Sequence, residues 1–262
     1  MRTTLIVCLL LALPGGAACA ADSPWNGTWK LDPQKSHLTG QTFSYSERPG
    51  GMLHYEDGST ASFDFGLDGK EYKTWANRTT AWTAAGGNAW DTVTRVDGKV
   101  RSKGHIALSG DGKTLTMTFT GTRPDGQDFR EEDVFSRVSG TEGLAGTWRA
   151  TRVTGPTGQP QTFVVSTPAA GVLHFEVPDM QASAEGRADG TDHPLTGPTV
   201  PPGMTISWKL LTPTKIRYVI KLNGKPDNGG VQALAADGGS FTDTNWNADR
   251  EKEKTVAVYV KQ

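Results

Sequence analysis

Apolar and polar residues alternate along most of the chain after its first twenty residues. The segments 63–67, 114–120, 215–222 and 255–260 each carry apolar side chains at every second position. A period of two is typical of a β-strand that buries one face, and the many threonine and aromatic residues also favour strands. No stretch beyond residue 20 has a convincing apolar helical period. The pattern therefore predicts an all-β protein.

Glycine-containing turn signals separate these segments. An Asp-Gly pair supplies the positive φ that a tight hairpin turn requires. Most of the signals lie roughly ten to fourteen residues apart, which leaves room for one strand between turns. We therefore expect about eight to ten short antiparallel strands in each half of the chain. Sequential hairpins close naturally into an up-and-down β-barrel, which removes exposed sheet edges; a β-sandwich is the alternative.

The chain repeats itself with a long period. Residues 41–55 align without a gap on residues 161–175, and seven of the fifteen positions are identical. The triplet Gly27-Thr28-Trp29 returns as Gly146-Thr147-Trp148. The offset of 120 residues (161 − 41) is too long for a solenoid repeat and has the size of a whole domain. The sequence therefore predicts two homologous domains in tandem.

The domain boundaries follow from this repeat and from the N-terminal segment. Residues 1–20 combine an early arginine, a short apolar run and an Ala-Cys-Ala cleavage pattern, which together are typical of a signal peptide. We therefore expect a signal peptide at 1–20, one barrel at 23–140 and a second barrel at 141–262. The linker at 139–143 is small and polar, and it is so short that the two barrels should touch.

Both cysteines, Cys8 and Cys19, lie in the predicted signal peptide, so no disulfide is expected in the mature chain. This usage favours a protein of the bacterial periplasm, or one secreted from the cell. We do not expect a lipoprotein acylated at Cys19, because the residues before that cysteine lack the leucine that leads a lipoprotein signal.

The charge is nearly balanced, with 27 Lys and Arg against 28 Asp and Glu. No basic face is large enough to predict binding to nucleic acid or to an anionic membrane. No apolar segment beyond residue 20 approaches the length of a transmembrane helix. The partners that remain are a small apolar ligand or a protein of the cell envelope.

Each copy opens with a Gly-x-Trp triplet and carries a basic residue in its last strand. The pair is Trp29 and Arg137 in the first copy, and Trp148 and Lys261 in the second. This resembles the lipocalin (calycin-type) pattern, in which the tryptophan plugs one end of the barrel and the cation packs across the indole. A cation over the ring would add about 0.5–2 kcal/mol. The resemblance implies two lipocalin-like up-and-down barrels.

The chain also resembles a group of uncharacterised secreted bacterial proteins of lipocalin-like type. The resemblance covers essentially the whole mature chain and implies a fold and a location, but no activity and no functional residues. It is carried by the motifs at Gly27–Leu31 with Lys35-Ser36, at Asp68–Tyr72, at Ser109–Thr116, at Asp189–Gly197 and at Val258–Gln262.

Two His-x-Glu pairs occupy equivalent positions, His54 with Glu56 and His174 with Glu176. At strand spacing each pair projects on one face, and imidazole with carboxylate suits a divalent metal. No third ligand is indicated, so we expect these side chains to face solvent and predict no metal site and no cofactor. The mixed charge run at 249–254 reads as a solvated strand edge.

Aromatic residues give the first copy its candidate ligand site. A barrel interior can hold a small ligand, although an eight-stranded barrel is only just wide enough for its own side chains. Trp75 and Trp82 lie near turns, where rim positions are plausible. The residues predicted to line the site are Phe63, Phe65, Trp75, Trp82 and Trp90.

We therefore expect a non-catalytic binding protein with a small apolar or amphipathic ligand in a barrel. The first alternative is a structural or interaction protein of the cell envelope, with both barrels filled. The second is a barrel-fold isomerase or hydrolase. It needs a polar pair inside a barrel, and a buried carboxylate with a strongly shifted pKa would favour it.

Overall fold

A computed structural model describes residues 23–154 and 160–262. The predicted signal peptide, with Cys8 and Cys19, lies outside the described residues. The described chain forms twenty β-strands and a single 3₁₀ turn, η1 (Pro178–Met180). In the same residues, none of the helical structure is both long and apolar enough to span a membrane.

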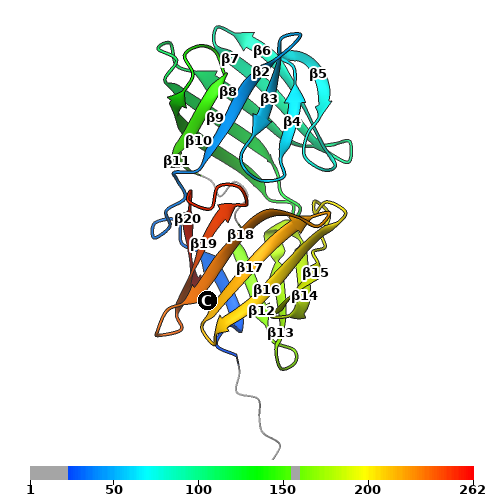
Figure 1. Ribbon diagram of the computed structural model, residues 1–262, viewed down its shortest axis with the longest axis vertical. Helices are drawn as coiled ribbons and strands as arrows, with labels where there is room; N and C mark the ends of the chain where they lie inside the picture. The colour runs from blue at the N-terminus through cyan, green and yellow to red at the C-terminus, as the bar shows by residue number, and fades with distance from the viewer. Residues whose placement is uncertain (1–22, 155–159) are drawn as a thin grey trace, which may run out of the picture.

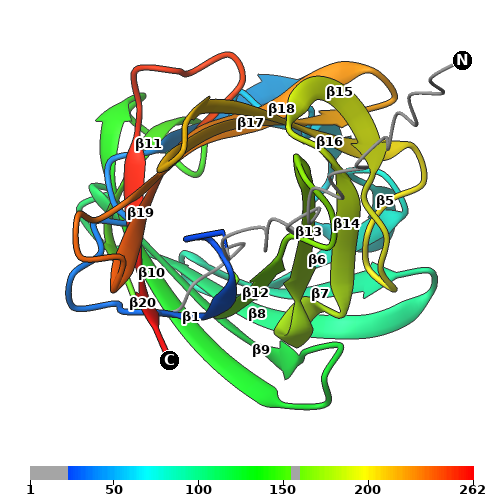
Figure 2. The same ribbon diagram turned by 90° about the horizontal axis from the view of Figure 1, so that it is seen from below.

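The strands form two sheets of ten, and each sheet curls into a nearly closed barrel (Figures 1 and 2). Barrel 1 has the order β4-β3-β2-β11-β10-β9-β8-β7-β6-β5. Its strands are β2 (Thr42–Arg48), β3 (Met52–Glu56), β4 (Ser62–Phe65), β5 (Asp68–Lys73), β6 (Arg78–Gly86), β7 (Ala89–Val96), β8 (Lys99–Leu108), β9 (Thr114–Thr122), β10 (Asp128–Ser139) and β11 (Gly146–Val153).

Barrel 2 has the order β14-β13-β12-β1-β20-β19-β18-β17-β16-β15. A bridge between Ser183 and Thr196 joins its two edge regions. Its strands are β1 (Gly27–Leu31), β12 (Thr162–Ser166), β13 (Val172–Val177), β14 (Ala182–Arg187), β15 (Asp189–Pro194), β16 (Met204–Thr212), β17 (Lys215–Leu222), β18 (Lys225–Leu234), β19 (Ser240–Asn247) and β20 (Thr255–Lys261).

All neighbouring strands within each sheet are antiparallel, as hairpin connections require. The prediction of two tandem up-and-down barrels is therefore confirmed. The alternative, a β-sandwich, is wrong, because each sheet curls into its own barrel. The two barrels lie end to end (Figure 1), and Figure 2 shows the strands arranged around a common centre.

The first strand of each copy lies in the barrel of the other copy. Strand β1 pairs with β12 and β20, whereas β11 pairs with β10 and β2. In Figure 1 the blue strand β1 accordingly stands among the strands of the lower barrel. Barrel 1 is thus built from residues 42–153, and barrel 2 from 27–31 together with 162–261.

The expected division of the strands at residue 140 needs this correction. The segment 139–143 does not link two barrels, because it belongs to the loop between β10 and β11 of one barrel. So short a loop keeps consecutive strands side by side, since sequential strands usually pair. The barrels are instead joined through residues 32–41 and through the segment that leads from β11 to β12.

Both barrels have a continuous apolar core of inward side chains. In β17, Ile216 and Tyr218 point inward, as the alternation predicted. In β20 the buried face belongs to Thr255, Ala257 and Tyr259, while the alternating valines lie on the outer, half-buried face. Those valines lie next to the segment 32–41, where the backbone of Val256 pairs with His37.

Candidate functional site

Each barrel end that lies away from the other barrel is closed by a tryptophan with a cation over its ring. Trp29 and Trp148 are both fully buried. The Lys261 ammonium lies 5.1 Å from the ring centroid of Trp29, and the Arg137 guanidinium lies 4.2 Å from that of Trp148. The sequence paired these residues within each copy, and the exchanged first strands pair them across copies instead.

The glycine of each Gly-x-Trp triplet makes room for that cation. Gly27 and Gly146 have φ values of +145° and +138°. A Cβ at Gly27 would lie 2.7 Å from Cε of Lys261, and one at Gly146 would lie 2.1 Å from the carbonyl oxygen of Ser139 and 3.0 Å from Nη1 of Arg137. A side chain at Gly27 would displace the cation from the indole, and one at Gly146 would also push the two neighbouring strands apart. The four plug residues therefore pack as two cation–indole pairs at the barrel ends.

The predicted aromatic site of barrel 1 is distributed differently from the expectation. Phe65 and Trp82 are buried in the core, and Phe63 and Trp90 pack against it half-buried. Ring centroids lie 5.0 Å apart for Phe65 and Trp82, and 6.0 Å apart for Phe63 and Phe65. These rings are one another's neighbours, so they fill the barrel rather than surround a ligand.

Trp75 lies apart from this core, at the end of barrel 1 that faces barrel 2. Its Nε1 donates a hydrogen bond of 2.7 Å to Oγ1 of Thr60, and the guanidinium of Arg78 lies 5.0 Å from its ring centroid. Thr60 in turn donates its backbone N–H to the buried carboxylate of Asp227 in barrel 2, at 3.0 Å. Trp75 thus helps to join the barrels.

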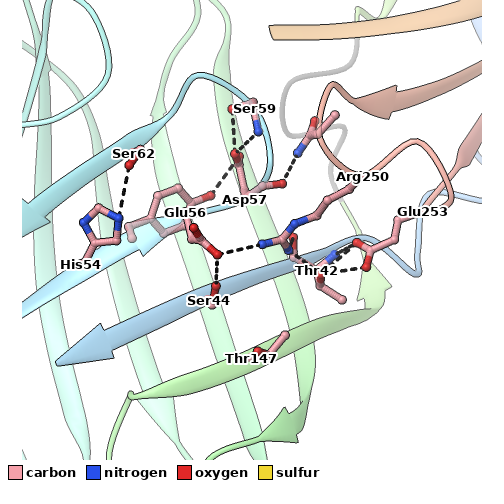
Figure 3. Close-up of polar contacts among 12 residues, drawn as sticks. Thr42, Ser44, His54, Glu56, Asp57, Ser59, Ser62, Thr147, Arg250 and Glu253 are labelled. Atoms are coloured by element: carbon pink, nitrogen blue, oxygen red, sulfur yellow. Dashed lines mark hydrogen bonds and ion pairs between the residues drawn. The ribbon is translucent and has the colours of Figure 1, made fainter.

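The joint between the barrels is polar (Figure 3). Arg250 of barrel 2 donates a hydrogen bond of 2.6 Å to the carbonyl of Thr42 and approaches Glu56 at 3.4 Å. Glu253 accepts hydrogen bonds of 2.9 Å and 2.8 Å from the backbone N–H and hydroxyl of Thr42. The prediction of a solvated strand edge at 249–254 is wrong, because this charge run forms a loop that binds barrel 1.

The two His-x-Glu pairs make ordinary surface contacts. His54 Nδ1 lies 2.6 Å from Asp64, and Ser62 lies 3.2 Å from its Nε2. His174 Nε2 lies 3.0 Å from Glu176. Across residues 23–154 and 160–262, no group of three or more His, Cys, Asp or Glu side chains could hold a metal ion.

Barrel 2 contains a buried polar cluster that the sequence analysis does not predict. Asp243 is 3% exposed, and Tyr218 donates a hydrogen bond of 3.2 Å to its carboxylate. Burial raises the pKa of Asp243 to about 7, against the smaller opposing effect of hydrogen bonds from Tyr218 and Gln232. Burial also holds the pKa of Tyr218 well above 10, so this hydroxyl keeps its proton. The alternation along the strand does indicate this position. Phe241, two residues earlier, is a core residue, so Asp243 lies on the same inward face.

The outer wall of barrel 2 carries a groove of about 410 Å³ between strands β17–β19 and the loop 248–254. Trp246 forms part of it and is 7% exposed. The cationic groups of Arg217 and Lys254 lie 6.0 Å and 5.1 Å from the indole centroid, and Lys215 lines the same groove. In the described part of the chain, none of these three cations has a carboxylate within 4.0 Å.

The first copy does not repeat the central residues of this groove, so the fold does not require them. At an offset of 126 residues, set by the turns (223 − 97 and 237 − 111), Arg217 corresponds to Asp91 and Trp246 to Thr120. The inward Asp243 corresponds to Met117, whereas barrel 1 buries the carboxylates of Glu131 and Asp133 on strand β10. A second hollow of about 230 Å³ lies where the segment 32–41 meets the end of β11. Neither hollow is lined by the aromatic core of a barrel.

Comparison of the chain with protein-family models, with curated proteins and with solved structures finds no match. The two nearly closed antiparallel barrels are consistent with a lipocalin-like fold. A tandem pair of barrels of this kind is compatible with a binding protein.

Proposed function

We propose that this chain is an exported, non-catalytic binding protein that recognises an anionic partner at the outer groove of barrel 2. The observation that carries the proposal is the convergence of Arg217, Lys254 and Lys215 on one groove. Glu251 lines the same groove but lies within 4.0 Å of none of the three cations. Like charges held together repel each other, and a bound anion would relieve that repulsion.

The packing of the barrels supports an outer site over an inner one. In barrel 1, the rings of Tyr45, Phe65 and Trp82 lie with centroids 5.0–6.2 Å apart. In barrel 2, Phe241 stacks on Tyr259 at 4.8 Å. Interiors packed in this way act as structural cores, so an outer site is favoured. The shifted carboxyl of Asp243 is the feature that an isomerase or hydrolase would require, but Asp243 lies in such a core and lines neither of the two hollows described above.

Isothermal titration calorimetry tests the proposal with polyglutamate, oligogalacturonate and inorganic phosphate as probes. We expect at least one of these anions to bind, and the double variant Arg217→Ala/Lys254→Ala to weaken it at least tenfold. The matched control is Lys99→Ala/Lys103→Ala, which removes two exposed charges from barrel 1 and should leave affinity unchanged. If no anion binds, or if both double variants behave alike, the proposal fails.

A small ligand inside barrel 2 is the second candidate, and one observation favours it. The Oε1 atom of Gln232 is buried without a hydrogen-bond partner, on a side chain that is 4% exposed. An unpaired buried acceptor costs about 1–3 kcal/mol, which a donor group on a ligand would recover. Titration of the tryptophan fluorescence with fatty acids, quinones, retinoids and haem checks this. A response that survives Gln232→Leu unchanged would contradict a role for this atom.

A further inference from the structure

We infer that the anionic partner of the outer groove is a carboxylate-bearing sugar chain, an inference that rests on the function proposed above. The other polymeric anion to consider is an acidic peptide. The strand pairing and the side chains of this wall favour a sugar chain over a peptide.

The wall offers no free backbone to a peptide. Strands β17, β18 and β19 are internal strands, and each is paired along both of its edges. Extended peptides usually gain affinity by adding a strand to an open sheet edge, where main-chain hydrogen bonds form. At this groove, recognition depends on side chains alone, and a sugar chain is recognised in that way.

The side chains of the groove match the parts of an acidic sugar. Val231 and Ala233 supply an apolar floor for the C–H face of a sugar ring, and the Thr244 hydroxyl stands beside them on the next strand. The guanidinium of Arg217 can bind a carboxylate through two parallel hydrogen bonds. The indole of Trp246 lies beneath this group and holds it in place.

The size of the groove agrees with this class of ligand. Its volume of about 410 Å³ falls within the roughly 300–1,000 Å³ that small-molecule sites occupy. Glu251 on the loop side adds an acceptor for sugar hydroxyls. An inorganic phosphate would use the cations but leave the apolar floor and Glu251 without a role.

The test compares trigalacturonate with a neutral trisaccharide, a glutamate tripeptide and inorganic phosphate, by calorimetry on the full chain. We expect trigalacturonate to bind at least tenfold more tightly than each of the others. Arg217→Ala should weaken it at least tenfold, and Arg217→Lys, which keeps the charge but loses the planar fork, about threefold to tenfold. Lys103→Ala is the control, and thermal melting verifies that each variant is folded.

The outcomes separate this inference from the proposed function. Equal or tighter binding of the glutamate tripeptide or of phosphate would overturn the sugar assignment and leave the anion site standing. Equal binding of the neutral trisaccharide would also overturn it, because the carboxylate would then play no part. Failure of every anion would overturn both.

Discussion

Replacing Asp243 by asparagine tests whether the polar cluster inside barrel 2 is uncharged in the folded protein. The carboxyl group is 3% exposed and has a pKa of about 7, raised chiefly by burial. Asparagine has the same shape without the charge, and its carbonyl can still accept the hydrogen bond of Tyr218. The variant therefore removes one titration and little else.

The magnitude follows from the two pKa values of this group. In the unfolded chain the carboxyl titrates near its ordinary value of 3.8, and in the folded protein near 7. Between these values the folded protein holds one more proton than the unfolded chain, so the unfolding free energy decreases as the pH rises. The stabilisation of the folded protein by this group is fully present below about pH 4 and is lost as the pH rises through 7. At about 1.4 kcal/mol per pH unit it amounts to about 4 kcal/mol.

Urea unfolding of the wild type and of Asp243→Asn between pH 5 and pH 8 measures this. We expect the wild type to lose about 3 kcal/mol of unfolding free energy relative to the variant over that range. Asp237→Asn, in an exposed turn, is the control and should follow the wild type. Parallel pH profiles for the wild type and Asp243→Asn would refute a buried carboxyl that is neutral below pH 7.

Three further predictions concern the plug, the joint and the exchanged strand. Trp29→Ala leaves a cavity where a fully buried indole stood and should lower the unfolding free energy by about 3–5 kcal/mol in urea melts; a loss below 1 kcal/mol would contradict the plug. Gly58→Ala would place a Cβ 2.5 Å from Cγ of Arg250, whereas the control position Gly126 also has a positive φ but open space around it. The Gly58→Ala protein should therefore be less stable than the Gly126→Ala protein by about 1–3 kcal/mol. Equal melting temperatures of the two variants would contradict a role of Arg250 in the joint. Deleting residues 23–31 should abolish amide-exchange protection in barrel 2 and leave barrel 1 protected, and protection of barrel 2 in that chain would mean that β1 is dispensable.

Much of the fold could be predicted from local pattern. Alternation in segments such as 215–222 and the Asp-Gly turns specify strands and hairpins, and hairpins in series specify an antiparallel barrel. The exchange of first strands could not be predicted, because Gly27-Thr28-Trp29 and Gly146-Thr147-Trp148 carry the same triplet. Either triplet fits either barrel. The short loop after β10 keeps β11 beside β10, so β11 joins barrel 1 and β1 is left to join barrel 2.

The candidate groove could not be predicted, because it depends on which side chains face outward on three strands at once. Trp246 would ordinarily be read as a core residue, yet Phe241, Asp243 and Asn245 occupy the inward positions of its strand. Only the register of β19 places the indole on the wall. The aromatic residues of the first copy, by contrast, suggest a ligand site from the sequence, but rings such as Trp82 pack in the barrel core.

The pairing of β1 with β20 affects the order in which the protein can mature. Trp29 and Lys261 are cross-strand neighbours, although 232 residues (261 − 29) separate them along the chain. Barrel 1 can form from residues 42–153 alone, whereas barrel 2 stays incomplete until both of its distant segments, 27–31 and 162–261, are present. Contacts so distant along the chain slow folding, and a prematurely stopped product would keep an unpaired edge that chaperones and proteases can recognise.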